Sequence, residues 1–80
     1  MKYVYLLQSI AYPEQRYVGL TNNLQHRLAT HNQGGSPYTS RYTPWHIVTA
    51  IRFNDDQRAF AFEQYLKTGS GRAFANKHLW

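Results

Sequence analysis

A chain of 80 residues that contains no cysteine cannot be held together by disulfides. The same absence excludes cysteine-type zinc sites and thiol nucleophiles. A chain of this length has room for one small core, so we expect a single domain over residues 1–80. Its stability must come from apolar burial, for which seven tyrosines, four phenylalanines and two tryptophans supply large side chains.

The charge balance favours a polyanionic partner. Nine Lys and Arg against four Asp and Glu give a formal charge of +5, and such an excess attracts phosphates. The alternative is that the charge serves only solubility. No apolar run is long enough for a membrane span, and Gln8 and Ser9 interrupt the apolar start before it could serve as a signal peptide. We therefore expect no membrane partner and a cytoplasmic location.

Apolar runs separated by turn-forming residues predict the element order β-β-α-β-α-α. The expected elements are strands over 2–8 and 16–20, a helix over 23–32, a mobile loop over 33–44, a strand over 45–53, and helices over 55–67 and 71–78. Short polar residues around Asn23 and Asp55 are typical N-caps. Gly69 and Gly71 are expected to end the second helix. This order predicts an α+β fold with helices packed on a small antiparallel sheet.

Ionisable side chains lie within the apolar stripes of the first two predicted helices. Positions i, i+3, i+4 and i+7 share one helix face, which places Arg27 and His31 beside Leu24 and Leu28. Glu63 has the same kind of position in the second helix. Such groups are costly at a core boundary unless they are paired. They indicate either a functional site or a structural Arg27–Glu63 ion pair with His31 bonded to the backbone.

The spacing of these residues resembles that of the GIY-YIG nuclease family. Tyr3-Val4-Tyr5 precedes Tyr17-Val18-Gly19, and the segments VYLL, RYVGLTNNLQHRLATHN, FEQYLK and SGRAFA follow the family's order over nearly the whole chain. The resemblance implies a three-stranded antiparallel sheet flanked by helices, metal-dependent cleavage of DNA, and a catalytic surface on one face of the sheet. The chain departs from the pattern at Tyr3, where the family has glycine. It also has Leu20 where some relatives carry a lysine, so any phosphate contact from that position is missing.

By position, the resemblance implies catalytic roles for five residues: Tyr5, Tyr17, Arg27, His31 and Glu63. It places one Mg²⁺ or Mn²⁺ on Glu63, and a lone carboxylate is enough because hydrated Mg²⁺ often takes one or two protein ligands. Arg27 would bind the phosphate oxygens. Tyr17 would act as general base only with Arg27 and the metal close by. His31 would relay a proton or orient the attacking water, and Tyr5 would hydrogen-bond the phosphate or the water.

Five further residues are candidates for binding nucleic acid. Arg41 and Tyr42 interleave charge and aromatic surface in the predicted loop, which suits unpaired bases, although a flexible loop with anchoring aromatics has the same pattern. Lys67 and Arg72 extend the positive track or form a solvated face. Asn76 is a candidate for a polar residue near the C-terminus that assists the site in some relatives.

The leading hypothesis is therefore a metal-dependent DNA endonuclease acting on branched, damaged or single-stranded DNA. The alternatives are a nucleic-acid-binding module that has lost turnover and a structural or interaction domain. Because 80 residues leave no room for a targeting domain, a protein partner that supplies targeting is also expected.

Overall fold

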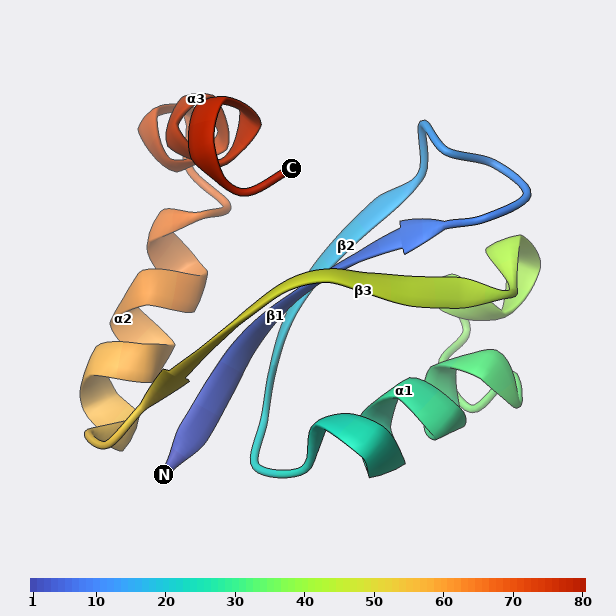
Figure 1. The fold of residues 1–80 in the computed structure, drawn as a ribbon, viewed down its shortest axis with the longest axis horizontal. Helices are drawn as coiled ribbons and strands as arrows, with labels where there is room; N and C mark the ends of the chain where they lie inside the picture. Colours follow the sequence, from blue (N-terminus) through green and yellow to red (C-terminus); the bar gives the residue numbers. More distant parts are fainter.

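The computed structural model describes residues 1–80 as a three-stranded antiparallel sheet with helices on both faces (Figure 1). The elements are β1 (Lys2–Ser9), β2 (Arg16–Thr21), α1 (Leu24–Asn32), a 3₁₀ helix η1 (Thr39–Tyr42), β3 (Trp45–Phe53), α2 (Asp56–Tyr65) and α3 (Gly69–His78). The predicted α+β class and the order β-β-α-β-α-α are confirmed, with η1 as an additional short element.

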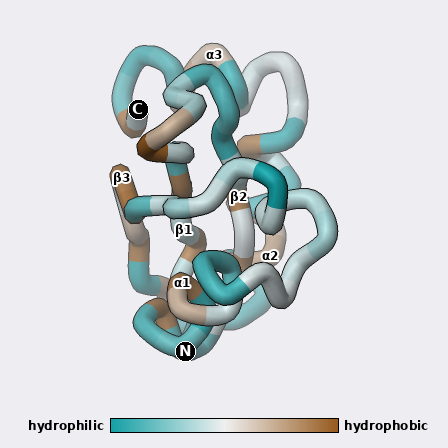
Figure 2. The backbone as a smooth tube through the Cα atoms, turned by 90° about the vertical axis from the view of Figure 1, so that its right-hand side faces the viewer, coloured by the Kyte–Doolittle hydropathy of each residue, from teal (hydrophilic) through white to brown (hydrophobic).

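The central strand β1 carries the core on both of its faces. It lies between β2 and β3 and pairs antiparallel with each of them. Its side chains from Val4 to Leu7 are all buried, as expected for a strand covered on two sides. Since successive side chains point to opposite faces, Val4 and Leu6 belong to one core and Tyr5 and Leu7 to the other. Figure 2 shows the hydrophobic residues along the strands and hydrophilic stretches in the helices and loops.

The two cores place the helices on opposite sides of the sheet. Val4 and Leu6 pack against Ala59 of α2, Leu66 at the end of that helix, and Ala75 of α3. Tyr5 and Leu7 pack with Trp45 and with the half-buried leucines of α1. The first helix therefore covers one face of the sheet, and the second and third helices cover the other.

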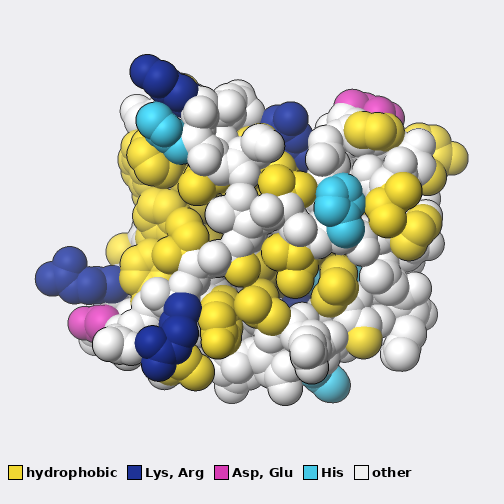
Figure 3. All heavy atoms as spheres, in the orientation of Figure 1, with side chains coloured by type: hydrophobic (Ala, Val, Ile, Leu, Met, Phe, Trp, Pro, Cys, Tyr) yellow, Lys and Arg dark blue, Asp and Glu magenta, His cyan; other side chains and the backbone are white.

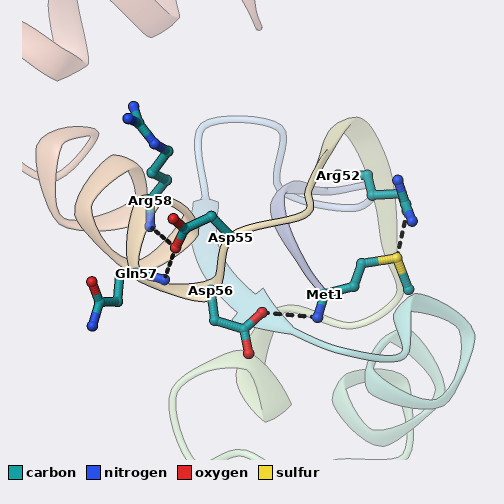
Figure 4. Close-up of polar contacts among 6 residues, drawn as sticks. All are labelled: Met1, Arg52, Asp55, Asp56, Gln57 and Arg58. Carbon is teal, nitrogen blue, oxygen red and sulfur yellow. Dashed lines mark hydrogen bonds and ion pairs between the residues drawn. The ribbon is translucent and has the colours of Figure 1, made fainter.

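The start of α2 confirms the capping predicted from the sequence (Figure 4). The Asp55 carboxylate accepts hydrogen bonds from the backbone N–H groups of Gln57 and Arg58, at 2.8 and 3.3 Å. Asp56 forms a 2.9 Å ion pair with the Met1 ammonium, which lowers the pKa of the exposed Asp56 carboxyl. Asn23 caps α1 in the same way by accepting from the backbone of His26.

The two glycines expected to end the second helix lie inside the third. α2 ends at Tyr65, and α3 begins at Gly69 with Thr68 as its N-cap, whose hydroxyl accepts from the Gly71 N–H at 3.1 Å. A Cβ at Gly71 would lie 1.8 Å from the Tyr65 carbonyl oxygen. Gly71 thus allows a close approach of α3 to the end of α2 and does not act as a helix breaker.

Part of the segment predicted as a mobile loop is a fixed structure. Residues Thr39–Tyr42 form η1, and Thr39 is fully buried. The Trp45 indole donates a 2.8 Å hydrogen bond to the Thr39 carbonyl, and the Ser9 hydroxyl donates to the Tyr42 carbonyl at 2.7 Å. Glycine and proline predicted a loop, but these contacts anchor it.

The outer surface of α2 and α3 carries exposed aromatic side chains. Phe60, Tyr65 and Phe74 are between 38% and 56% exposed, and Figure 3 shows hydrophobic side chains gathered over these helices. No helix has both the length and the apolar character needed to cross a membrane.

Candidate active site

A chain of hydrogen bonds joins four side chains on the α1 face of the sheet. Arg27 Nε donates to the Tyr5 hydroxyl at 3.3 Å, and that hydroxyl lies 3.0 Å from His31 Nε2. His31 Nδ1 in turn lies 2.7 Å from the Thr39 hydroxyl. Tyr5, His31 and Thr39 are almost completely buried. A buried polar network of this kind is stable only when its members are satisfied, and each of these groups has a partner.

The members of this network come from β1, α1 and η1, and the neighbouring strand β2 makes room for one of them. Tyr5 lies on β1 directly opposite Gly19 of β2, and a Cβ at Gly19 would lie 2.4 Å from the Tyr5 hydroxyl. The missing side chain therefore makes room for the Tyr5 phenol across the neighbouring strand. Arg27 and His31 are one turn apart on α1 and share the face that meets it.

Tyr17 completes the group. Its ring lies 5.0 Å from the His31 ring and 6.2 Å from the Tyr5 ring, measured between centroids. Hydrogen bonding to Tyr5, followed by interaction with Tyr17, raises the pKa of Arg27. The requirement that Arg27 lie close to Tyr17 agrees with this geometry, because Arg27 bonds Tyr5, whose ring packs beside that of Tyr17.

Tyr5 remains a neutral phenol. Burial raises the pKa of Tyr5, the hydrogen bond from Arg27 acts in the opposite direction, and the charges of Tyr17 and Glu63 add to the rise. A neutral phenol can donate one hydrogen bond while it accepts others. Tyr5 can therefore link Arg27 to His31.

His31 is held in its neutral form. Burial lowers the pKa of His31, and the positive charge of Arg27 lowers it further. The expected backbone partner for this ring is wrong, because both of its nitrogens face side chains, those of Tyr5 and Thr39. A neutral imidazole in such a hydrogen-bond chain can accept a proton on one ring nitrogen while its other nitrogen keeps its hydrogen bond.

The lowered pKa of His31 predicts acid sensitivity of the fold. The unfolded chain protonates this ring near its ordinary pKa of about 6.5, whereas the folded chain does so only at lower pH. The stabilisation is therefore present above about pH 6.5 and is lost as the pH falls through the folded value. We expect the free energy of unfolding, measured with urea from pH 8 to pH 5, to fall less steeply in His31→Gln than in the wild type. The exposed His46→Gln is the matched control, and an unchanged slope in His31→Gln would contradict the prediction.

Glu63 lies on α2 and is only 6% exposed. One carboxylate oxygen accepts from the Gln64 amide at 2.7 Å, and the other lies 2.5 Å from the Lys67 ammonium. The alternative Arg27–Glu63 ion pair is wrong, because Arg27 bonds Tyr5 and Glu63 pairs with Lys67. The chain contains no cluster of three or more His, Asp or Glu side chains that could hold a metal. The Glu63 carboxylate, which here pairs with the Lys67 ammonium, fits a hydrated Mg²⁺ or Mn²⁺ as a single ligand. Such an ion keeps waters and phosphate oxygens as its other ligands.

The five candidate catalytic residues come from both faces of the sheet. A catalytic surface on one face was expected, but α2, which carries Glu63, lies opposite α1. The two sides meet at β2, which is an edge strand. A cleft of about 600 Å³ wraps this edge, with Tyr17 and Tyr38 on one side and Lys67, the partner of Glu63, on the other. We call it the β2-edge cleft.

Only some of the candidate nucleic-acid-binding residues line the β2-edge cleft. Lys67, Arg72 and Asn76 line it, whereas Arg41 and Tyr42 do not. Tyr42 packs edge-on against Tyr12 and Tyr38, with ring centroids 5.6 and 6.0 Å apart. Tyr42 therefore anchors this segment by aromatic packing, and its role in binding nucleic acid stays a prediction.

Two residues of the cleft were missed by the sequence reasoning. Arg16 and Trp80 both line it, and the Arg16 guanidinium lies over the Trp80 ring at 4.7 Å. Strand alternation gave a signal for Arg16, because it precedes Tyr17 and must point to the opposite face. The sequence holds no such signal for Trp80.

The fold and the site define a class of protein. Residues 1–77 match the GIY-YIG catalytic domain family, and the chain belongs to that family. It is 38% identical over 68 residues to a UPF0213 protein from Clostridium perfringens, which covers 84% of this chain and 71% of that protein. It is 37% identical over 65 residues to a structure-specific endonuclease subunit SLX1 homolog from Giardia intestinalis, which covers 76% of this chain and 18% of that protein. The chain thus spans about a fifth of the length of the SLX1 relatives it matches.

Proposed function

We propose that this chain is a metal-dependent endonuclease domain that hydrolyses phosphodiester bonds in DNA. The observation that carries the proposal is the contact of Arg27 with the buried Tyr5–His31 pair. Tyr17, whose ring packs beside both of these rings, lines a basic cleft together with Lys67, the partner of Glu63. Membership of the GIY-YIG catalytic domain family supports it. The SLX1 relatives are named structure-specific endonuclease subunits, which favours branched, damaged or single-stranded DNA as the substrate.

Arg27 supplies the counter-charge for the phosphate in this proposal. Hydrolysis needs an activated water, compensation for the charge of the transition state, and a stabilised leaving oxygen. The bond from Nε to Tyr5 holds the guanidinium in one orientation. Its terminal N–H groups can then bind two non-bridging oxygens in the geometry that phosphate prefers.

Tyr17 is the proposed general base, and His31 is the group that receives or relays its proton. The two rings pack edge to face, and the lowered pKa of His31 keeps its imidazole neutral. Its Nε2 contacts the Tyr5 hydroxyl, so a proton from Tyr17 would reach His31 through Tyr5. Glu63 would hold the metal, with Lys67 released toward the substrate. Bound Mg²⁺ or Mn²⁺ would polarise the phosphate and lower the pKa of a bound water.

A cleavage assay with matched variants tests this proposal. The wild type, Tyr17→Phe and Glu63→Ala are incubated with single-stranded, duplex and forked DNA, with Mg²⁺, with Mn²⁺ and with a chelator. We expect metal-dependent cutting by the wild type and a loss of about 100-fold or more in both variants. Tyr12→Phe and Asp56→Asn are the controls, because both residues lie outside the cleft. Cleavage by Glu63→Ala at the wild-type rate would refute the role of Glu63.

The same assay distinguishes the nuclease from a binding module. If every variant binds DNA alike, with a steep salt dependence and without cleavage, the chain is a nucleic-acid-binding module that retains the fold. A protein partner that supplies targeting is part of the proposal, because the SLX1 relatives are named subunits. The cytoplasmic location stays a prediction from the sequence.

A further inference from the structure

We propose that the β2-edge cleft binds an unpaired nucleotide of a single DNA strand, with Arg16 on its phosphate and Tyr38 against its base. This inference deepens the proposed function and rests on DNA as the substrate. It concerns the part of the cleft formed by the start of β2, the Tyr38 side chain and α3, next to Tyr17.

The Arg16 guanidinium is held in place without a carboxylate. Its Nη1 donates to the Asn76 side-chain oxygen at 3.0 Å, and its Cζ lies over the Trp80 ring, 4.7 Å from the ring centroid. The ion pairs of the chain are Met1–Asp56 and Glu63–Lys67, so Arg16 has no acidic partner. A guanidinium has five N–H donors in a fixed fork, and Asn76 uses one of them. The remaining donors are available for an anion such as a phosphate.

The surrounding charge supports an anionic ligand. Lys67 and Arg72 line the same cleft, and Glu14 is its one acidic lining residue. Arg72 also takes part in no ion pair. Phosphate is an anion that suits a cleft lined by several cations, planar guanidinium groups among them.

The aromatic wall supports an unpaired base. Tyr38 is 48% exposed and is fixed by a 3.1 Å hydrogen bond from its hydroxyl to the Gln15 side chain. Its ring lies 6.1 Å from that of Tyr17 at an angle of 31°. A fixed and exposed ring is a stacking surface for a base, and stacking requires a base that is not paired within a duplex.

The size of the cleft favours one strand over two. Its volume of about 600 Å³ lies in the range of sites that enclose small ligands, about 300–1,000 Å³. That space suits one or two nucleotides. A double helix is too wide to enter it, since its major groove alone is about 12 Å wide.

Binding measured in a chelator tests the cleft separately from catalysis. A fluorescently labelled 12-nucleotide single strand is titrated with the wild type, Arg16→Gln and Tyr38→Ala at several salt concentrations. We expect each variant to bind about tenfold more weakly, the loss typical of one stacked base or phosphate contact. Arg16→Gln should also lower the slope of log K against log salt by about 0.7, whereas Tyr38→Ala should not change it. The control is Arg58→Gln, because Arg58 is exposed on α2 outside the cleft.

Trp80 provides a second readout that does not depend on the stability of a variant. Trp45 is buried and Trp80 is half-buried beside Arg16, so a strand in the cleft should change the fluorescence of Trp80. We expect this change in the wild type and its loss in Trp80→Phe. Unchanged fluorescence at saturating strand would overturn the proposal.

Two further outcomes separate this inference from the proposed function. Glu63→Ala, which should lose cleavage, is expected to bind the single strand at least as tightly as the wild type. If Arg16→Gln binds the single strand like Arg58→Gln, the cleft does not bind an unpaired nucleotide. The same conclusion follows if Arg16→Gln and Tyr38→Ala weaken the binding of a blunt duplex as much as that of the single strand. The cleavage assay can succeed in either case, since it depends on Glu63 and Tyr17.

Discussion

Arg27→Met is expected to lower the rate of DNA cleavage by about 100-fold or more while the protein remains folded. In the proposed mechanism, Arg27 is the cation that faces the phosphate, and loss of one such preorganised donor costs about 10²–10³ in rate. The fold should persist because the Tyr5 hydroxyl keeps His31 as a hydrogen-bond partner at 3.0 Å when Arg27 is removed. Single-turnover cleavage and thermal unfolding of the same preparations measure the two effects.

Two comparison variants show whether the lower cleavage rate of Arg27→Met comes from the loss of the guanidinium group itself. Arg27→Lys keeps the charge without the planar fork, so its rate should lie between those of the wild type and Arg27→Met. Arg58→Met removes an exposed charge outside the cleft and should cut at close to the wild-type rate. A rate for Arg27→Met within about fivefold of the wild type would rule out the role of Arg27, since one oxyanion-type donor contributes far more than that.

Gly71→Ala is expected to destabilise the fold by about 3 kcal/mol, at the upper end of the usual cost of overpacking. The new Cβ would lie 1.8 Å from the Tyr65 carbonyl oxygen and 2.7 Å from Leu66 Cα. Both contacts are with backbone, which cannot rotate away as a side chain could. The Tyr65 carbonyl also accepts hydrogen bonds from the Thr68 N–H and hydroxyl, at 3.0 and 2.7 Å. Moving it would strain the turn between α2 and α3.

Gly69→Ala is the matched control, two residues earlier in the same helix. A Cβ at Gly69 meets nothing within 4 Å, and a change of less than about 1 kcal/mol is expected there. Urea unfolding of both variants measures the difference, and 3 kcal/mol corresponds to a fall in Tm of more than about 12 °C for a domain of this size. Equal stability of the two variants would show that α3 shifts away from α2 without cost.

Local chemistry made several features of the fold predictable. The caps at Asn23 and Asp55 were found from the sequence because an N-cap bonds within its own first helical turn. The strands and helices were found because apolar runs of different length alternate with turn-forming residues along the chain. The prediction failed at Gly71, because glycine was taken to end a helix, whereas here it allows close contact with the end of the neighbouring helix.

The sequence predicted several members of the candidate site but not their arrangement. The helical wheel placed Arg27, His31 and Glu63 in apolar stripes, and His31 and Glu63 are buried as that placement requires. A wheel gives the direction of a side chain around its own helix but does not say which face of the sheet the helix covers. For that reason the Arg27–Glu63 pair was wrong, and the contacts of Tyr5 with both Arg27 and His31 were not foreseen.

The sequence by itself determined the elements, their order, the family resemblance and the residues that carry the proposed chemistry, because each depends on residue types and on spacing along the chain. The tertiary structure decided which of these residues meet. It placed α1 and α2 on opposite faces and brought Arg16 beside Trp80, two residues far apart in the chain. It also buried Thr39 against His31. These contacts arise from the packing of both sheet faces around β1 and the open edge of β2, and the spacing of residues along the chain does not contain that information.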